Sequence, residues 1–122
     1  MVMNKKRVII IHGFQGNTDT GWKPWIKKEL ERHGFEITIP AMPNPYQPKL
    51  NDWIAKIHEV VATPDENTYF IGHSLGCVTI AHYLATLPQD TKIGGCVFVA
   101  GFSGNLHIPE IYEFYIEPLD VE

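Results

Sequence analysis

Short apolar runs alternate with segments of helical spacing along this chain of 122 residues. The continuous apolar runs, several of them β-branched, predict strands at residues 7–11, 35–39, 68–71 and 95–100. Apolar positions at helical spacing predict helices that begin near Pro24, Leu50 and Leu75 and end before Gly34, before Pro64 and at Leu87. Strands that alternate with helices of this length predict a parallel sheet with helices on both faces. We therefore expect an α/β fold with three αβα layers.

Glycine-rich loops follow the first, third and fourth predicted strands, at residues 12–21, 72–76 and 101–107. Active sites in parallel sheets form where the carboxyl ends of the strands meet, so these loops are expected to surround the site. The proline-rich segment 40–48 is expected to be an extended connection. In the first helix the predicted apolar stripe is Trp25, Ile26 and Leu30. At the end of the chain, helical spacing predicts one face from Ile108, Ile111, Tyr112, Tyr115 and Leu119.

The pentapeptide Gly72-His73-Ser74-Leu75-Gly76 follows the third predicted strand and begins the third predicted helix. It matches Gly-x-Ser-x-Gly, the strand-to-helix turn that presents a nucleophilic serine at the edge of a sheet. The serine of such a turn has a strained backbone, and side chains at the two glycine positions would collide with the neighbouring strand and helix. The motif therefore predicts Ser74 as a catalytic nucleophile, with a purely structural glycine turn as the alternative.

A serine nucleophile needs partners, because a base must remove its proton and N–H donors must bind the oxyanion that forms on attack. Leu75 follows the serine at a helix N-terminus, where its backbone N–H has no partner within the helix. The loop after the first strand, His12-Gly13-Phe14, offers the Phe14 amide as the second donor. Each donor of this kind contributes about 3 kcal/mol to the transition state. Phe14 and Leu75 are therefore the predicted oxyanion hole.

Composition and charge exclude several classes of protein. A net charge of −4 offers no basic surface for nucleic acid or for an anionic membrane, and no apolar stretch approaches the length of a membrane span. Cys77 and Cys96 lie in apolar segments without metal-binding spacing, so we expect reduced core thiols in a cytoplasmic protein. No phosphate-binding glycine motif occurs, and no cofactor or metal is expected. The length suits one domain, residues 1–122.

Further segments resemble one family of small enzymes. They are Val8-Ile9-Ile10-Ile11-His12-Gly13, Trp22-Lys23-Pro24-Trp25, Met42-Pro43-Asn44-Pro45, Asn51-Asp52-Trp53 and Gly94-Gly95-Cys96-Val97. Together with the pentapeptide around Ser74, they resemble the small α/β-hydrolases of the YdeN type and the retinoblastoma-binding-protein type. The resemblance implies an α/β-hydrolase fold, Ser74 as the nucleophile, and small esters or amides as substrates. It covers roughly the amino-terminal two-thirds of the family's pattern and so implies a fold that lacks its carboxyl-terminal strands and helices.

The acid and base of that family lie beyond the matching segments, in an Asp-bearing loop and a Gly-His segment. The triad order Ser…Asp…His therefore cannot be completed by its usual members, and efficient hydrolysis by these residues alone is not expected. His107 is the best local substitute base, because its loop reaches the edge that carries Ser74, with ordinary loop polarity as the alternative. His82 lies about 12 Å from Ser74 along the helix and is out of reach. His12 precedes the oxyanion loop and is not expected to be the base.

A sheet that ends at the fourth strand would expose an edge whose apolar faces are partly uncovered. We expect such a chain to aggregate, to pair with a copy of itself through that edge, or to depend on a further segment. We also expect it to be a truncated or partial form of a larger protein. Two functions stay open at this point: a serine hydrolase of small esters or amides, and a non-catalytic protein-interaction module on a hydrolase scaffold.

Overall fold

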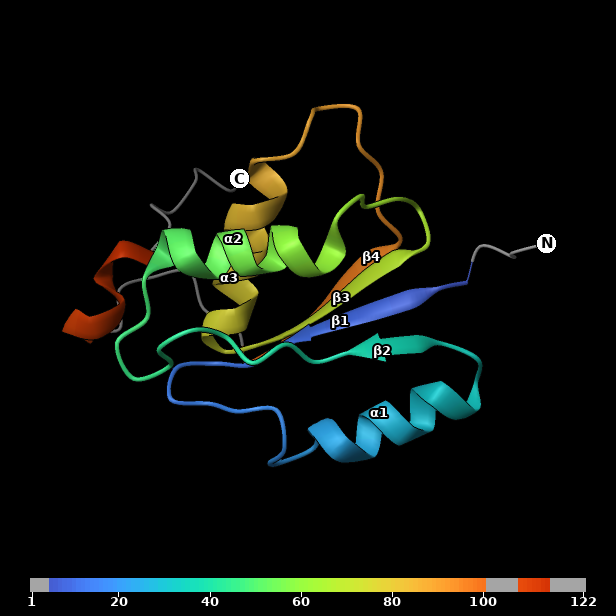
Figure 1. Ribbon diagram of the computed structural model, residues 1–122, viewed down its shortest axis with the longest axis horizontal. Helices are drawn as coiled ribbons and strands as arrows, with labels where there is room; N and C mark the ends of the chain where they lie inside the picture. Colours follow the sequence, from blue (N-terminus) through green and yellow to red (C-terminus); the bar gives the residue numbers. More distant parts are fainter. Residues whose placement is uncertain (1–4, 101–107, 115–122) are drawn as a thin grey trace.

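Strands and helices alternate along the folded chain (Figure 1). In the computed structural model, which describes residues 5–100 and 108–114, the strands are β1 (Arg7–Ile11), β2 (Glu36–Thr38), β3 (Thr68–His73) and β4 (Gly95–Val99). The helices are α1 (Lys23–Arg32), α2 (Leu50–Val61), α3 (Leu75–Ala85) and the 3₁₀ helix η1 (Pro109–Phe114). The strands and helices predicted before residue 100 are confirmed, with ends that differ by one or two residues.

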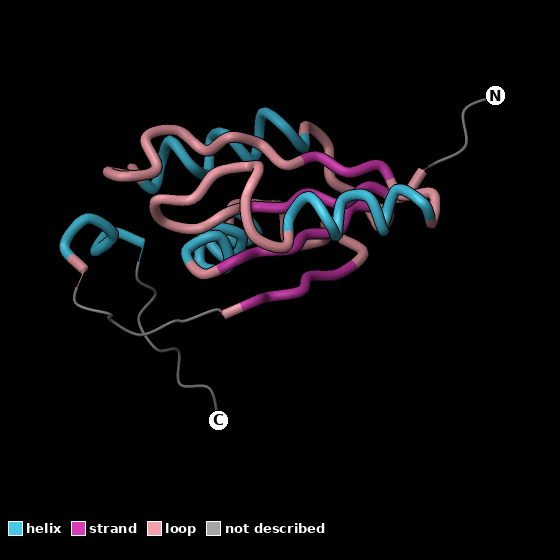
Figure 2. Tube along the Cα trace, turned by 90° about the horizontal axis from the view of Figure 1, so that it is seen from below, coloured by secondary structure: helices cyan, strands magenta, loops and turns pink. Residues whose placement is uncertain are grey.

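The sheet is parallel throughout the described residues, in the spatial order β2-β1-β3-β4. Helix α1 lies on one face, and α2 and α3 lie on the other (Figure 1). In Figure 2 the strands lie side by side, with β4 at the edge of the sheet. Ile11 is paired with Gly72, and His73 with Val99. The predicted three-layer αβα fold is confirmed, and these registers bring the ends of β1, β3 and β4 to one edge.

The hydrophobic core holds β1 and β3, the strands whose ends carry the predicted site. Ile9, Ile10 and Ile11 are each at most 1% exposed, as their continuous apolar run predicts for a strand covered on both faces. The largest side chains of the core cluster are Trp53, Phe70, Tyr83 and Phe114. Trp53 therefore packs in the core.

The predicted apolar stripe of α1 is wrong in one position. Trp25 is 64% exposed, whereas Lys23 is buried and Ile26 and Leu30 are half-buried. Successive helical residues are rotated by about 100°, so Lys23, Ile26 and Leu30, spaced i, i+3 and i+7, share one face. Trp25 lies off that face, and the aliphatic stem of a lysine takes the buried position at the start of the helix.

The last described segment forms a 3₁₀ helix rather than the predicted α-helical face. A 3₁₀ helix has about three residues per turn, so side chains three apart align. Ile111 and Phe114 are buried and Ile108 is half-buried against the core. Tyr112, which the α-helical spacing placed on the buried face, is exposed. Tyr115 and Leu119 lie outside the described residues.

Strand β4 forms an exposed edge of the described sheet. Val97 is 58% exposed and Phe98 is 49% exposed, and Cys96 is exposed, so the prediction of Cys96 as a core thiol is wrong. On the face of α1, an apolar hollow of about 390 Å³ lies beside this strand. It is lined by Val8, Leu30, Phe35, Tyr69, Phe70, Ile71, Gly95, Cys96 and Val97. Cys77 and Cys96 are free thiols, as predicted.

Candidate active site

Ser74 occupies the sharp turn between β3 and α3. Its backbone has φ 54° and ψ −116°, a conformation that costs a non-glycine residue about 1–3 kcal/mol. The turn is held on both sides, because the Ser74 N–H donates to the Val99 carbonyl at 2.9 Å and the Ser74 carbonyl accepts from the Cys77 N–H at 2.9 Å. The side chain is partly buried, and no hydrogen bond to it is formed by the residues that the structure describes.

The glycines on either side of Ser74 are required by close backbone approach, as predicted. A Cβ atom at Gly76 would lie 2.1 Å from the Ile11 carbonyl oxygen. A Cβ atom at Gly72 would lie 2.8 Å from the backbone nitrogen of Cys77. Because both obstacles are backbone atoms, no rotation of a side chain could relieve them. The two glycines therefore let α3 leave β3 directly against the end of β1.

The loop after β1 lies against the same turn. A Cβ atom at Gly13 would lie 3.1 Å from the Ser74 Cβ and 3.6 Å from the Leu75 nitrogen. Phe14 follows Gly13 and packs against the core, and Leu75 is the first residue of α3. Within the described residues, neither the Phe14 amide nor the Leu75 amide donates a hydrogen bond to a backbone or side-chain acceptor. Two amides that lack partners among the described residues thus lie close to Ser74 in sequence or space, one on the loop after β1 and one at the start of α3.

His12 is a buried residue with both ring nitrogens engaged. Its Nδ1 lies 2.9 Å from the Gly13 carbonyl oxygen, and its Nε2 lies 3.1 Å from the Met42 nitrogen. Burial lowers the pKa of His12 below its ordinary value, the charges of Lys23 and His73 lower it further, and the Gly13 carbonyl opposes them. This arrangement agrees with the expectation that His12 is not the base. Its bond to Met42 was missed from the sequence, where a histidine directly after a buried strand was the available signal.

None of the remaining described histidines forms a hydrogen bond to the Ser74 hydroxyl. The ring of His73 packs edge-to-face on Trp22, with centroids 5.9 Å apart. His82, on α3, has its Nε2 2.8 Å from the Phe114 carbonyl oxygen. His33 and His58 are exposed. The proposed substitute base His107 lies outside the described residues, as does its whole loop 101–107.

Lys23 places a buried cation near this edge of the sheet. It is 5% exposed and follows Trp22, whose ring contacts His73. Desolvation lowers the pKa of the Lys23 amine, and the charge of Asp19 opposes the shift.

Over the described residues, no group of three His, Cys, Asp or Glu side chains is arranged to hold a metal ion. In the same part of the chain, none of the helices has the length and apolar character to cross a membrane.

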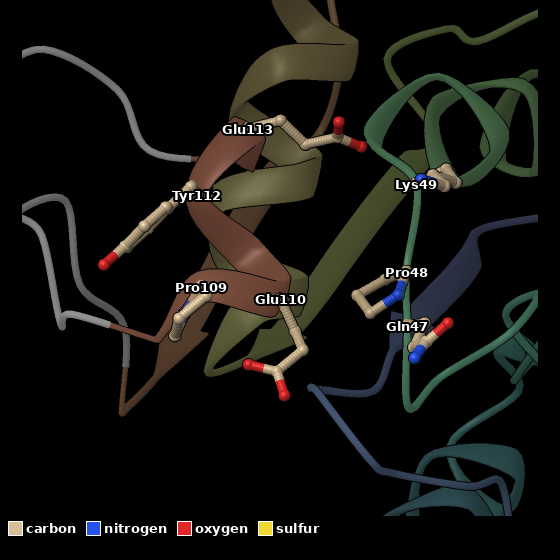
Figure 3. A pocket seen from close by; sticks show the side chains of 7 residues that line it. All are labelled: Gln47, Pro48, Lys49, Pro109, Glu110, Tyr112 and Glu113. Carbon is tan, nitrogen blue, oxygen red and sulfur yellow. The ribbon is translucent and has the colours of Figure 1, made fainter.

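A separate polar hollow of about 330 Å³ lies between η1 and the start of α2 (Figure 3). It is lined by Gln47, Pro48, Lys49, Pro109, Glu110, Tyr112 and Glu113. The Glu113 carboxylate accepts a hydrogen bond from the Leu50 N–H and so caps the first turn of α2. The side chain of Lys49, the residue before this helix, forms no capping bond. The hollow therefore belongs to the attachment of η1 and not to the Ser74 turn.

A strained serine turn at the edge of a parallel sheet is typical of serine hydrolases, and sequence comparison points to the same class. A sequence profile of the serine hydrolase family matches residues 8–119. The chain belongs to the serine hydrolase family. Its strand order, helix layers and structural neighbours show an α/β-hydrolase fold.

The relatives place the chain more closely within the family. YdeN of Bacillus subtilis (strain 168), which is named as a hydrolase, is 42% identical over 101 residues, or 83% of this chain and 53% of its own length. The crystal structure of the B. subtilis ydeN gene product matches with a TM-score of 0.84 and 38% identity, over 95% of this chain and 63% of that chain. Polyneuridine aldehyde esterase matches with a TM-score of 0.60 and 25% identity, over 80% of this chain and 41% of its own.

These comparisons confirm the YdeN-like resemblance, whereas the likeness to hydrolases of the retinoblastoma-binding-protein type stays a prediction. The chain spans about half the length of the curated relative that it matches. The comparisons therefore show the family of this chain, and its activity and substrates are proposed below.

Proposed function

We propose that this chain supplies the nucleophile and the oxyanion donors of a serine hydrolase that acts on small esters or amides. The observation that carries the proposal is the positive φ of Ser74 at a turn where Gly13 lies in contact distance. A strained serine at a strand-to-helix turn, beside a glycine loop from the first strand, is the arrangement that acyl transfer uses.

In the proposed reaction Ser74 Oγ attacks the carbonyl carbon of the substrate. Its proton passes to a general base, and the carbonyl oxygen takes the negative charge. The Phe14 and Leu75 amides donate hydrogen bonds to that oxygen. The alcohol or amine then leaves with a proton as the carbonyl forms again, and water releases the acyl group from Ser74. We place the base and its acid partner outside the described residues, because no described histidine bonds to the serine.

A phosphonylation experiment tests this proposal on the chain as it stands. A fluorophosphonate probe reacts with an activated serine, and free imidazole in the buffer can act as the base that the described residues do not supply. We expect a mass-spectrometric adduct at Ser74, formed faster as imidazole is added. The chain contains two serines, Ser74 and Ser103, which makes Ser103→Ala a matched control for Ser74→Ala.

The adduct should persist in the Ser103→Ala chain and be absent from the Ser74→Ala chain. Labelling at Ser103, or no labelling of a folded chain at any imidazole concentration, would contradict the proposal. With short-chain nitrophenyl esters, release of nitrophenolate should depend on Ser74 in the same way. The alternative of a non-catalytic interaction module is not favoured, since the matching relatives are named as hydrolases and an esterase.

Two further properties belong to this proposal. We place the chain in the cytoplasm, on the ground that Cys77 and Cys96 are free thiols; fractionation of cells that express it would test this. We also propose that the exposed edge of β4 pairs with a second copy of the chain, because its backbone and its apolar side chains lack a covering element within the described structure.

A further inference from the structure

His12 links the loop that carries Phe14 to the proline-rich segment that precedes α2. The Met42 N–H can only donate, so the ring nitrogen that it meets, Nε2, must accept. The proton of the neutral ring is then on Nδ1, which donates to the Gly13 carbonyl. His12 is therefore held in one tautomer by two backbone groups that are far apart in sequence.

The residues on both sides of Phe14 are tied by hydrogen bonds. The Gly13 carbonyl accepts from the His12 ring at 2.9 Å and from the Gly16 N–H at 2.9 Å. The Gln15 N–H donates to the Pro45 carbonyl at 2.7 Å. Between them, the Phe14 amide keeps its proton unbonded among the described residues. The loop is thus fixed in place around a donor that is left available.

The proline-rich segment 40–48, which contains Met42 and Pro45, is itself held in place by Trp53. The Trp53 Nε1–H donates to the Pro43 carbonyl at 2.7 Å, and the His12 and Trp53 rings meet edge-to-face with centroids 5.6 Å apart. Trp53 is fully buried in α2 and cannot shift without opening the core. A continuous set of contacts therefore runs from the core through Trp53, Pro43 and His12 to the loop beside Ser74.

We propose that neutral His12 is a positioning residue that fixes the Phe14 amide toward the oxyanion, by joining Gly13 to Met42. This inference rests on the proposed function, since it presumes that Ser74 reacts through an oxyanion. We call the two bonds of the His12 ring to Gly13 and Met42 the backbone clamp. The ring contacts no reacting atom, and loss of the ring would leave Ser74 in place while the Phe14 amide moves. Placement errors of about 1 Å in such groups can slow a reaction by about a hundredfold.

Protonation of His12 would break the clamp, because a proton on Nε2 would face the Met42 N–H. The charged or titratable groups that act on the ring are Lys23 from α1 and His73 from β3, whereas Trp53 from α2 and Met42 bring no charge. Burial and both of these charges lower the pKa of His12, so the ring stays neutral at neutral pH. The clamp should open only on the acid side of the ordinary histidine range.

The test compares His12→Phe, which removes both bonds, with His12→Gln, whose amide can replace one of them. Both are assayed for phosphonylation of Ser74 at one pH and one imidazole concentration. We expect the maximal labelling rate to fall roughly 10- to 100-fold in His12→Phe and less in His12→Gln, with the half-saturating probe concentration unchanged. A change confined to the half-saturating concentration would overturn the inference.

A second measurement does not depend on labelling or on the folding of a variant. In ¹⁵N spectra of the wild-type chain, His12 should carry its proton on Nδ1, and Nε2 should be coupled to the Met42 amide across the hydrogen bond. A proton on Nε2 at neutral pH would overturn the inference, as would Ser74-dependent labelling at full rate in His12→Phe. Labelling that does not require Ser74 would instead overturn the proposed function, so the two failures are distinguishable.

Discussion

Strands β1 and β4 have similar apolar sequences, Val8-Ile9-Ile10-Ile11 and Cys96-Val97-Phe98-Val99, yet they lie in opposite surroundings. The first is buried along most of its length and the second is exposed along most of its length. β1 pairs on both edges, with β2 and β3, whereas in the described structure β4 pairs with β3 and forms an edge. The comparison teaches that an apolar run indicates what a strand can bury, and that its neighbours decide whether it does so.

The Ser74 turn lies between these two regions. Gly76 fits it against the end of β1 with no room for a methyl group, and Gly13 lies in tight contact with it. On the other side, the Ser74 amide bonds to Val99 at the end of exposed β4. The candidate site is therefore closely packed on the side of the loop after β1 and depends on an edge strand on the other side.

The largest effect is expected from Gly76→Ala. Alanine would favour the helix by about 1 kcal/mol, but its Cβ would lie 2.1 Å from the Ile11 carbonyl oxygen, and backbone overpacking of this kind costs about 3 kcal/mol or more. The matched control is Gly95→Ala on β4, where the nearest atoms lie 3.8 Å away and the free energy of unfolding should change by less than about 0.5 kcal/mol. Urea denaturation checks both. Equal midpoints for the two variants would contradict the close packing of the turn.

The two thiols should differ in alkylation rate. Cys77 is buried in α3, with its Sγ 3.6 Å from the Val99 carbonyl oxygen, whereas Cys96 is exposed on β4. Desolvation raises the pKa of both thiols, so neither gains reactivity from ionisation and accessibility decides. In dilute protein, iodoacetamide should modify Cys96 at least about 100-fold faster than Cys77, which reacts only from opened states. Peptide mass mapping measures both rates, and equal rates would refute the packing of α3 on the sheet.

A charge on the edge strand should weaken the proposed self-association. Val97→Lys places an ammonium group on an exposed apolar position of β4, and we expect the dissociation constant of the pair to rise about tenfold or more. Tyr46→Lys is the control, because Tyr46 is also an exposed apolar residue but lies on the connection before α2. Light scattering after size exclusion gives the masses. A wild-type chain that stays monomeric at high concentration would refute pairing through β4.

Residues that are close in sequence account for what could be predicted, and long-range contacts account for what could not. The alternating pattern predicts the sheet and its layers, and Gly72 to Gly76 predicts a strained turn, because both depend on local geometry. The bond from His12 to Met42 spans 30 positions, and the place of His12 directly after a buried strand does not indicate which residue it bonds to. The exposure of Cys96 and Trp25 likewise depends on which elements cover them. His107 could be placed on a loop by its sequence, but the geometry of that loop lies outside the described residues.

The smallest effect is expected from pH, through His12 on the closely packed side of the site. Its pKa is lowered in the folded chain, so its contribution to stability is complete above the unfolded value of about 6.5 and is lost as pH falls through the folded value. Between about pH 6.5 and 5.5 this one group should remove at most about 1 kcal/mol from the free energy of unfolding. His12→Gln, which cannot be protonated, should flatten that part of the profile, and His33→Gln at an exposed position is the control variant. If wild-type and His12→Gln chains give parallel profiles in urea titrations, His12 is not the buried neutral ring that clamps the oxyanion loop.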